Sequence, residues 1–247
     1  MARKSIRITA SIALVILLGF VAVVTLKAET KDSNVPAADA NAAASKTAGD
    51  MAPIPLVLPK PQFVGTPTNI QIANLEKPLN KPREPFYAPK GTTNVALKKP
   101  VKSSDEQPII GEIEMITDGD KEATDGSYVE LGPMKQYITI DLQAKYNIYA
   151  VVVWHYHKQG RVYKDVIVQV ADDQDFIKNV QTIYNNDTDN TLGLGAGKDK
   201  NYVETSEGRL IDAKGVVGRY VRCYSNGNTA NDLNNYIEVE VYGTPAK

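Results

Sequence analysis

The stretch Val151–Arg161, "VVVWHYHKQGR", contains the only tryptophan and both histidines of this 247-residue chain. Imidazole, phenol and guanidinium groups this close together suit a metal site, a catalytic base, a sugar-binding surface or the end of a strand. In an extended chain, alternation puts both histidines on one face and Trp154 and Tyr156 on the other. The apolar run ends where the histidines begin, so we expect the chain to leave the sheet near His155.

Metal binding and catalysis by these histidines are the weaker interpretations. Two histidines two positions apart can bind zinc or copper, but a catalytic zinc needs a third protein ligand. The sequence has no third histidine and a single cysteine, Cys223, which alternates with Val221 and is expected to be a buried thiol. No Gly-x-Ser-x-Gly elbow is present, and we expect no enzymatic activity.

A sugar-binding surface needs an aromatic ring against the C–H face of a pyranose and polar groups for its hydroxyls. The end of the "WHYH" stretch supplies both kinds of group, and the asparagine-rich segment Ser225–Asn235, "SNGNTANDLNN", can add amides. The alternative remains open that Trp154 is core, that the histidines cap a strand and that the asparagines only satisfy turns. The expected sugar contacts are Tyr156, His157, Arg161, Asn228 and Asn231.

A second chemical signal is the turn "DGD", in which Asp118 and Asp120 flank Gly119. Both carboxylates of such a turn can converge on one hard cation, and calcium takes six to eight oxygen ligands. Two other tempting motifs fail. "GLGAGK" has Leu192 where a phosphate-binding loop needs its first glycine, and "NNDTDN" has the same leucine where an EF-hand needs glycine.

The elements that must position these residues are strands. Apolar and polar residues alternate over 137–142, 162–170, 220–224 and 236–242, with many β-branched and aromatic side chains. No stretch between the linker and the C-terminus has a helical stripe with caps. Several short strands joined by Gly, Asn and Asp clusters predict an all-β fold, an antiparallel β-sandwich.

Six motifs in sequence order resemble the discoidin, or coagulation factor 5/8 type C, domain: "NVALKKPVKSS", "ITDGD", "YITIDL", "YKDVIVQVADDQDF", "GRYVRCY" and "YIEVEVYG". The resemblance spans Thr92 to Gly243 and implies a galactose-binding-like jelly roll, a fold shared with bacterial carbohydrate-binding modules. It also implies that Glu238 on the last strand is the family's calcium-facing acid. The expected ligands of a structural calcium ion are Asp118, Asp120 and Glu238, with Thr124 as a further oxygen donor.

The sequence departs from the family's pattern in two places. Tyr128 stands where the family usually has a tryptophan after the "DGD" turn. The segment Asn185–Glu207 is longer than a compact member needs, which predicts an enlarged loop. Both departures fall where recognition surfaces often lie.

The N-terminal third differs in composition. Arg3, Lys4 and Arg7 precede the uncharged apolar run Ile8–Leu26, which is close to the roughly 20 residues of a membrane-spanning helix. Residues 1–27 are therefore expected to be an apolar helix that acts as a membrane anchor or a cleaved signal peptide. Residues 28–90, rich in Ala and Pro, are expected to be a flexible, disordered linker, and residues 91–247 the folded domain.

Together these features predict an exported, non-catalytic module that recognises carbohydrate at the cell envelope and contains structural calcium. It is expected to be membrane-anchored and facing outward if the N-terminal segment is retained, and secreted or periplasmic if it is cleaved. The alternative is an adhesion or structural protein that binds another envelope protein through the enlarged loop, residues 185–207. The net charge of −1 gives no reason to expect nucleic acid as a partner.

Overall fold

The computed structural model describes residues 50–63, 70–79 and 81–247. The apolar segment 1–27 and the first part of the predicted linker lie outside these residues. No helix in the described ranges is long and apolar enough to cross a membrane. The elements are β1 (Met51–Pro53), β2 (Tyr87–Pro89), β3 (Thr93–Asn94), β4 (Val101–Ser103), the 3₁₀ helix η1 (Ile113–Thr117), β5 (Val129–Pro133), β6 (Lys135–His155), β7 (Ile167–Ala171), β8 (Gln181–Asn185), β9 (Arg209–Asn226) and β10 (Leu233–Pro245).

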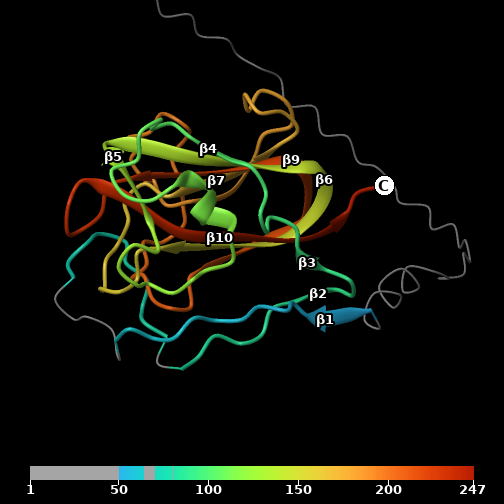
Figure 1. Ribbon diagram of the computed structural model, residues 1–247, viewed down its shortest axis with the longest axis horizontal. Helices are drawn as coiled ribbons and strands as arrows, with labels where there is room; N and C mark the ends of the chain where they lie inside the picture. Colours follow the sequence, from blue (N-terminus) through green and yellow to red (C-terminus); the bar gives the residue numbers. More distant parts are fainter. Residues whose placement is uncertain (1–49, 64–69, 80) are drawn as a thin grey trace, which may run out of the picture. The chain divides into compact units, whose positions relative to one another are not determined.

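Two long strands, β6 and β9, pair with each other through both layers of the fold. Their antiparallel register shifts between Asp141 and Tyr146, where β6 bends (Figure 1). Before the bend, β6 also pairs with β4, while β9 pairs with β7 and thereby with β8. After the bend, β6 pairs with β10, which also pairs with β3 and β5. Strands that switch layers at a bend are typical of two packed sheets, and the predicted antiparallel all-β fold is confirmed.

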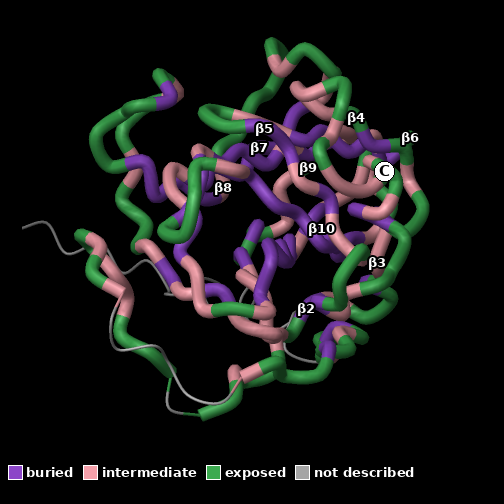
Figure 2. Tube along the Cα trace, turned by 60° about the vertical axis from the view of Figure 1, so that its left-hand side comes forward, coloured by how far each residue is buried: buried purple, intermediate pink, exposed green. Residues whose placement is uncertain are grey.

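The main core lies between the two layers, and its members come from the predicted alternation. Ile138, Ile140 and Leu142 of β6 are fully buried, as are Val221 and Cys223 of β9. In Figure 2 the buried residues follow the strands, while exposed residues follow the loops. The thiol of Cys223 is unpaired and buried, as expected from its alternation with valine.

One predicted strand is shorter than expected. The alternation over 162–170 yields a strand only from Ile167, where β7 begins. The preceding residues instead bond to the loop before β10: Val162 accepts from the Thr229 amide and Lys164 donates to Gly227. This pairing draws the segment out of the sheet and onto the rim of the sandwich.

The outer face of the β6–β10 layer is also apolar, and part of the N-terminal segment covers it. Here we call residues 50–63, 70–79 and 81–90 the strap; it runs beneath β10 in Figure 1. Within it, β1 pairs antiparallel with β2. Ile54 and Ala88 are buried in a second apolar cluster with Val152 and Trp154, against which Phe86 packs.

The prediction of a flexible linker over 28–90 is therefore wrong for the strap residues. Its prolines prevent a helix, but an extended chain can still lay apolar side chains across an apolar sheet face. The strap docks because it buries the apolar sheet face that includes Trp154 and Val152. Without the strap, the domain would lose the free energy gained by this burial. The folded unit thus includes residues before 91, among them β1 and β2 of the strap.

We expect Ile54→Asp to lower the free energy of unfolding by about 2–4 kcal/mol, because it places a carboxylate against Trp154 and Val152. Denaturant titration followed by the fluorescence of the single tryptophan measures this. The matched control is Val57→Asp, three residues along the strap and 70% exposed, which should change stability little. Equal stabilities of the two variants would show that the strap does not stabilise the domain.

Candidate functional site

Four consecutive side chains, Trp154 to His157, lie at the end of β6 and just beyond it. Each of them contacts another segment of the chain. The Trp154 Nε1–H donates to the Ser206 carbonyl at 3.0 Å. The His155 Nδ1 lies 2.6 Å from Glu204 Oε1. The His157 Nε2 donates to the Lys121 carbonyl at 3.0 Å, and the Tyr156 ring lies between two side chains of the rim.

Close approach at Trp154 requires glycine at position 208. Gly208 has a φ of +62°, and a Cβ there would lie 2.6 Å from Trp154 Cε2. The loop over 204–208 therefore rests directly on the indole, which is fully buried, as expected from its place beside Val152.

His155 and Glu204 form a pair with no solvent access, since both side chains are 0% exposed. The His155 ring also stacks on Tyr163, with ring centroids 4.2 Å apart, and lies 4.8 Å from the ring of Tyr236. The two histidines bond to different segments, His155 to Glu204 and His157 to the Lys121 carbonyl. Their contacts are those of side chains that fix loops, and the zinc or copper interpretation gains no support from them.

The rim patch consists of Tyr128, Tyr156 and Arg161. The ring centroids of the two tyrosines are 4.8 Å apart, with the rings tilted at 59°, and the Arg161 guanidinium carbon lies 4.8 Å from the Tyr156 centroid. Tyr156 is only 8% exposed, whereas Tyr128 and Arg161 are half-buried. Tyr128 and Arg161 thus present the outer surface of the patch, and Tyr156 supports them.

The asparagine loop 225–235 lies beside this patch. Val162, next to Arg161, donates its amide to Thr229 Oγ1 at 3.1 Å and accepts from the Thr229 amide. Asn231 is exposed and its Oδ1 accepts from the Leu233 amide and from Asn228. The structure thus brings together two of the predicted sugar contacts, Tyr156 and Arg161, and places the loop that carries Asn231 against Val162.

Two predicted sugar contacts are structural instead. His157 is 0% exposed and bonds the Lys121 carbonyl. Asn228 is 2% exposed; its Oδ1 accepts from the Ala230 and Asn231 amides, and its Nδ2 donates to the Leu233 carbonyl and to Asn231 Oδ1. Both side chains are buried and bond to neighbouring turn and loop groups, although His157 Nδ1 has no hydrogen-bond partner. Neither side chain is exposed to meet a ligand at the rim.

The acidic turn and the last long strand meet, as the resemblance implied. Gly119, with a φ of +97°, donates its amide to Glu238 Oε2 at 3.3 Å. The flanking carboxylates cap the turn, since Asp118 Oδ1 accepts from the Asp120 amide and Asp120 Oδ1 from the Glu122 amide. Residues 119 positions apart in the sequence are thereby joined.

Glu238 is buried with one carboxylate oxygen unpaired. Its side chain is 0% exposed, and Oε1 has no hydrogen-bond partner. Burial raises the pKa of Glu238 to about 9; the Gly119 amide opposes this rise, while Glu240 and Asp118 add to it. A cation at the turn would satisfy Oε1, and carboxylate oxygens of this kind are ligands that calcium takes. The oxygens of Asp118, Asp120 and Glu238 do not all lie within 4.8 Å of one another, so the three do not form a closed ligand set among the described residues. Thr124, the expected further donor, instead pairs with Ser127 at 2.7 Å.

Another acidic group lies near the enlarged loop. Asp165, Asp187 and Asp189 each place a carboxylate oxygen within 4.8 Å of the others. Asp187 is buried and accepts from the Thr191 and Leu192 amides. Sequence reasoning missed this group because Asp165 comes from a distant segment. The loop itself is partly packed, with Leu192 buried against Ile167 and Tyr224.

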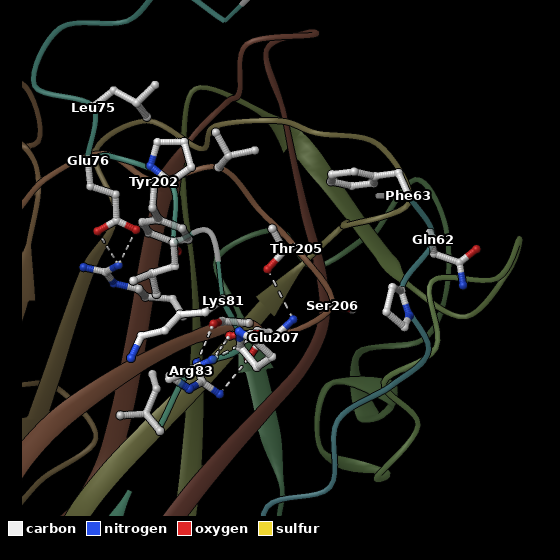
Figure 3. A pocket seen from close by; sticks show the side chains of 18 of the residues that line it. Gln62, Phe63, Leu75, Glu76, Lys81, Arg83, Tyr202, Thr205, Ser206 and Glu207 are labelled. Atoms are coloured by element: carbon white, nitrogen blue, oxygen red, sulfur yellow. Dashed lines mark hydrogen bonds and ion pairs between the residues drawn. The ribbon is translucent and has the colours of Figure 1, made fainter. Parts of the chain in front are cut away.

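A cavity of about 870 Å³ lies between the strap and the loop 202–210 (Figure 3). Sequence reasoning missed it because it exists only when the strap docks. It shares no lining residue with the rim patch.

Comparison with known proteins agrees with the motif resemblance. The family model of the NedA-like, galactose-binding domain, of the F5/8 type C group, matches residues 115–223. None of the curated proteins matches the chain. A fucose-binding module of Streptococcus pneumoniae is 18% identical with a TM-score of 0.45, and the match covers 63% of this chain and 98% of that one.

Two further solved structures are similar. A chitosan-binding module from a chitosanase/glucanase of Paenibacillus is 19% identical with a TM-score of 0.41, covering 61% of this chain and 98% of that one. A family 89 glycoside hydrolase of Clostridium perfringens is 19% identical with a TM-score of 0.45, over 62% of this chain and only 15% of that chain. The family match and the strand arrangement confirm the predicted resemblance to the F5/8 type C domain over residues 115–223.

The raised pKa of Glu238 makes stability depend on pH in protein treated with a chelator. The unfolded carboxyl releases its proton near its ordinary pKa of 4.5, whereas the folded one keeps it up to about 9. Over that window the unfolded state binds fewer protons, so the free energy of unfolding falls as pH rises. Glu238→Gln should flatten this decline in denaturant titrations between pH 5 and 8. Parallel profiles of wild type and variant would contradict the shift.

Proposed function

We propose that this chain is a non-catalytic carbohydrate-binding module whose ligand contacts the rim patch and the adjoining asparagine loop. One observation carries the proposal: Tyr128 and Arg161 both pack against the Tyr156 ring at the rim. The tilted Tyr128 ring and the Arg161 guanidinium carbon each lie 4.8 Å from the Tyr156 centroid. The match of residues 115–223 to a galactose-binding domain model supports it.

The chemistry of the patch suits a sugar ring. The exposed part of Tyr128 offers an aromatic face for pyranose C–H groups, and the Arg161 guanidinium offers several N–H donors for hydroxyls. Asn231 adds an amide from the loop that bonds to Val162, next to Arg161. Because Tyr156 and the buried "WHYH" contacts fix these groups before binding, little ordering of the protein accompanies association.

We further propose that Asp118, Asp120 and Glu238 bind a structural calcium ion. The ion would join the turn after η1 to β10 and neutralise the buried carboxylate of Glu238. The same turn continues to Lys121, whose carbonyl accepts from His157 beside the rim patch. Calcium in this place would therefore stabilise the support of the sugar site rather than touch the sugar.

We propose export for this module because basic residues precede the apolar run near the N-terminus. The glycan would then be one of the cell envelope or its surroundings. The adhesion alternative assigns binding to the loop 185–207, and the variants described below separate the two hypotheses because this loop contributes no side chain to the rim patch.

Removal of calcium should lower the melting temperature. A ligand that binds only the folded state adds RT ln(1 + [L]/Kd) to stability, about 2.7 kcal/mol at a hundredfold excess over Kd. Thermal melts in excess calcium and in excess chelator should therefore differ by several degrees, and Glu238→Gln should abolish most of this difference. Identical melts of the wild-type protein in calcium and chelator, with no calcium found by elemental analysis, would remove the ion from the proposal.

Glycan binding should depend on Arg161 and Tyr128. Arg161→Ala and Tyr128→Ala should each weaken binding on a glycan array or by calorimetry by about tenfold or more, since each loses a contact worth about 1.4 kcal/mol. The melting temperature should change little because both side chains are partly exposed. Asn228→Ala is the informative contrast, since it should lower the melting temperature through the loop. Unchanged glycan binding in both rim variants, or binding lost only when loop 185–207 is altered, would contradict the assignment.

A further inference from the structure

The cavity beneath the strap is lined by defined residues of the strap and of the loop 202–210. Its floor is the loop 202–210 and its walls are strap residues from two separate stretches (Figure 3). Its volume of about 870 Å³ falls within the range of roughly 300–1,000 Å³ that small-molecule sites occupy. The apolar side chains that line it are Phe63, Ile70, Leu75, Leu79, Val203 and Leu210.

Paired contacts fasten the strap along one side of this cavity. Glu76 receives the Arg209 guanidinium at 2.8 and 2.9 Å. The Arg83 guanidinium donates to the carbonyls of Glu207 and Gly208 at 3.0 Å each. Leu75 forms a parallel bridge with Asn201. These contacts fix the height of the strap above the loop.

The strap has little freedom to collapse into the space. Pro61, Pro78 and Pro82 line the cavity, and the fixed φ of proline stiffens the chain around each of them. Several apolar side chains therefore face a space that none of the described residues fills, although interiors are normally close-packed. A ligand with an apolar body would gain the free energy of burying those side chains.

The charges around the cavity decide what kind of ligand fits. Glu76 is paired with Arg209, Arg83 lies against Glu207, and Lys81 is paired with Glu84 at 2.7 Å. No formal charge among these is left to attract an ion, and a glycan would find these groups already engaged. Uncharged groups supply the remaining polar lining: the hydroxyls of Thr205, Ser206 and Tyr202 and the amide of Gln62.

We propose that this cavity is a second binding site, which takes an uncharged amphiphile: a small molecule with an apolar body and a neutral polar end. The apolar body lies against Phe63, Leu75 and Leu210, and the polar end meets the hydroxyls of Thr205 and Ser206. The site is distinct from the rim patch and does not depend on carbohydrate binding there.

The test uses the full chain and the neutral fluorescent probe N-phenyl-1-naphthylamine, displaced by a single-chain monoacylglycerol below its micellar concentration. The probe should bind with enhanced fluorescence, and the monoacylglycerol should displace it. Leu79→Asp, which places a charge at a lining position that is 67% exposed, should weaken both by about tenfold or more. The control Val57→Asp, also on the strap and 70% exposed but outside the cavity, should bind as the wild type does.

Val203→Trp provides a second variant, which fills the cavity from its floor and should also abolish probe binding. If this variant is poorly folded, the comparison of Leu79→Asp with Val57→Asp still decides the question, because both replace exposed side chains. Equal probe binding in those two variants would overturn the proposal. Displacement of the probe by a neutral oligosaccharide and not by the monoacylglycerol would overturn the ligand class. Neither result depends on Arg161 or Tyr128, so the rim-patch hypothesis is tested separately.

Discussion

The last residues of β6 are the constraint on which the rest of this domain depends. Loops on the rim of a β-sandwich have no ladder to satisfy their backbone groups, so side chains from the sheet must hold them. Trp154 and His155, the last two residues of β6, bond to Ser206 and Glu204 of one loop. His157, two residues beyond the strand, bonds to the Lys121 carbonyl of the segment after the acidic turn. The strap rests on the first of these segments, the acidic turn continues into the last, and the rim patch is built on the residue between the two histidines. One strand end thus relates the candidate calcium site, the rim patch and the cavity to one another.

The period-two pattern predicted most of the sandwich because burial in two layers needs only alternation. Ile138, Ile140, Val221 and Cys223 are core as that pattern requires. The burial of Trp154 also followed from its face of the strand. The strap could not be predicted in this way. Its apolar residues are sparse and interrupted by prolines, and nothing local indicates that the outer face of β6 and β10 needs a cover.

The candidate sites were predictable only in part, for a related reason. Residue type was enough to predict Tyr156 and Arg161 as sugar contacts. The proximity of Asp118 to Glu238 was predicted only from the motif resemblance, because no local sequence pattern relates residues so far apart. Residue type could not distinguish a side chain that meets a ligand from one that satisfies a loop. His157 and Asn228 have the chemistry of sugar contacts, yet backbone groups of their own surroundings use that chemistry. The distinction depends on which carbonyls and amides the rim leaves unpaired, and only the folded chain determines that.

Glu204 and Glu238 are both fully buried, but different contacts offset the free-energy cost of burying their carboxylates. Burial of a carboxylate is expensive unless a partner compensates it. Glu204 has the imidazole of His155 at 2.6 Å, and the pair fixes the loop beneath the strap. Glu238 has only one long bond, 3.3 Å from the Gly119 amide, and the acids Asp118 and Glu240 nearby. Lys121, the nearby cation, is paired with Glu240 instead. A carboxylate kept among other acids, without a basic partner of its own, must either hold a proton, which is the meaning of its raised pKa, or exchange that proton for a cation. The acidic turn is where such a cation would lie, since its Gly119 amide contacts Glu238 and the nearby Asp118 adds to the raised pKa of that carboxyl.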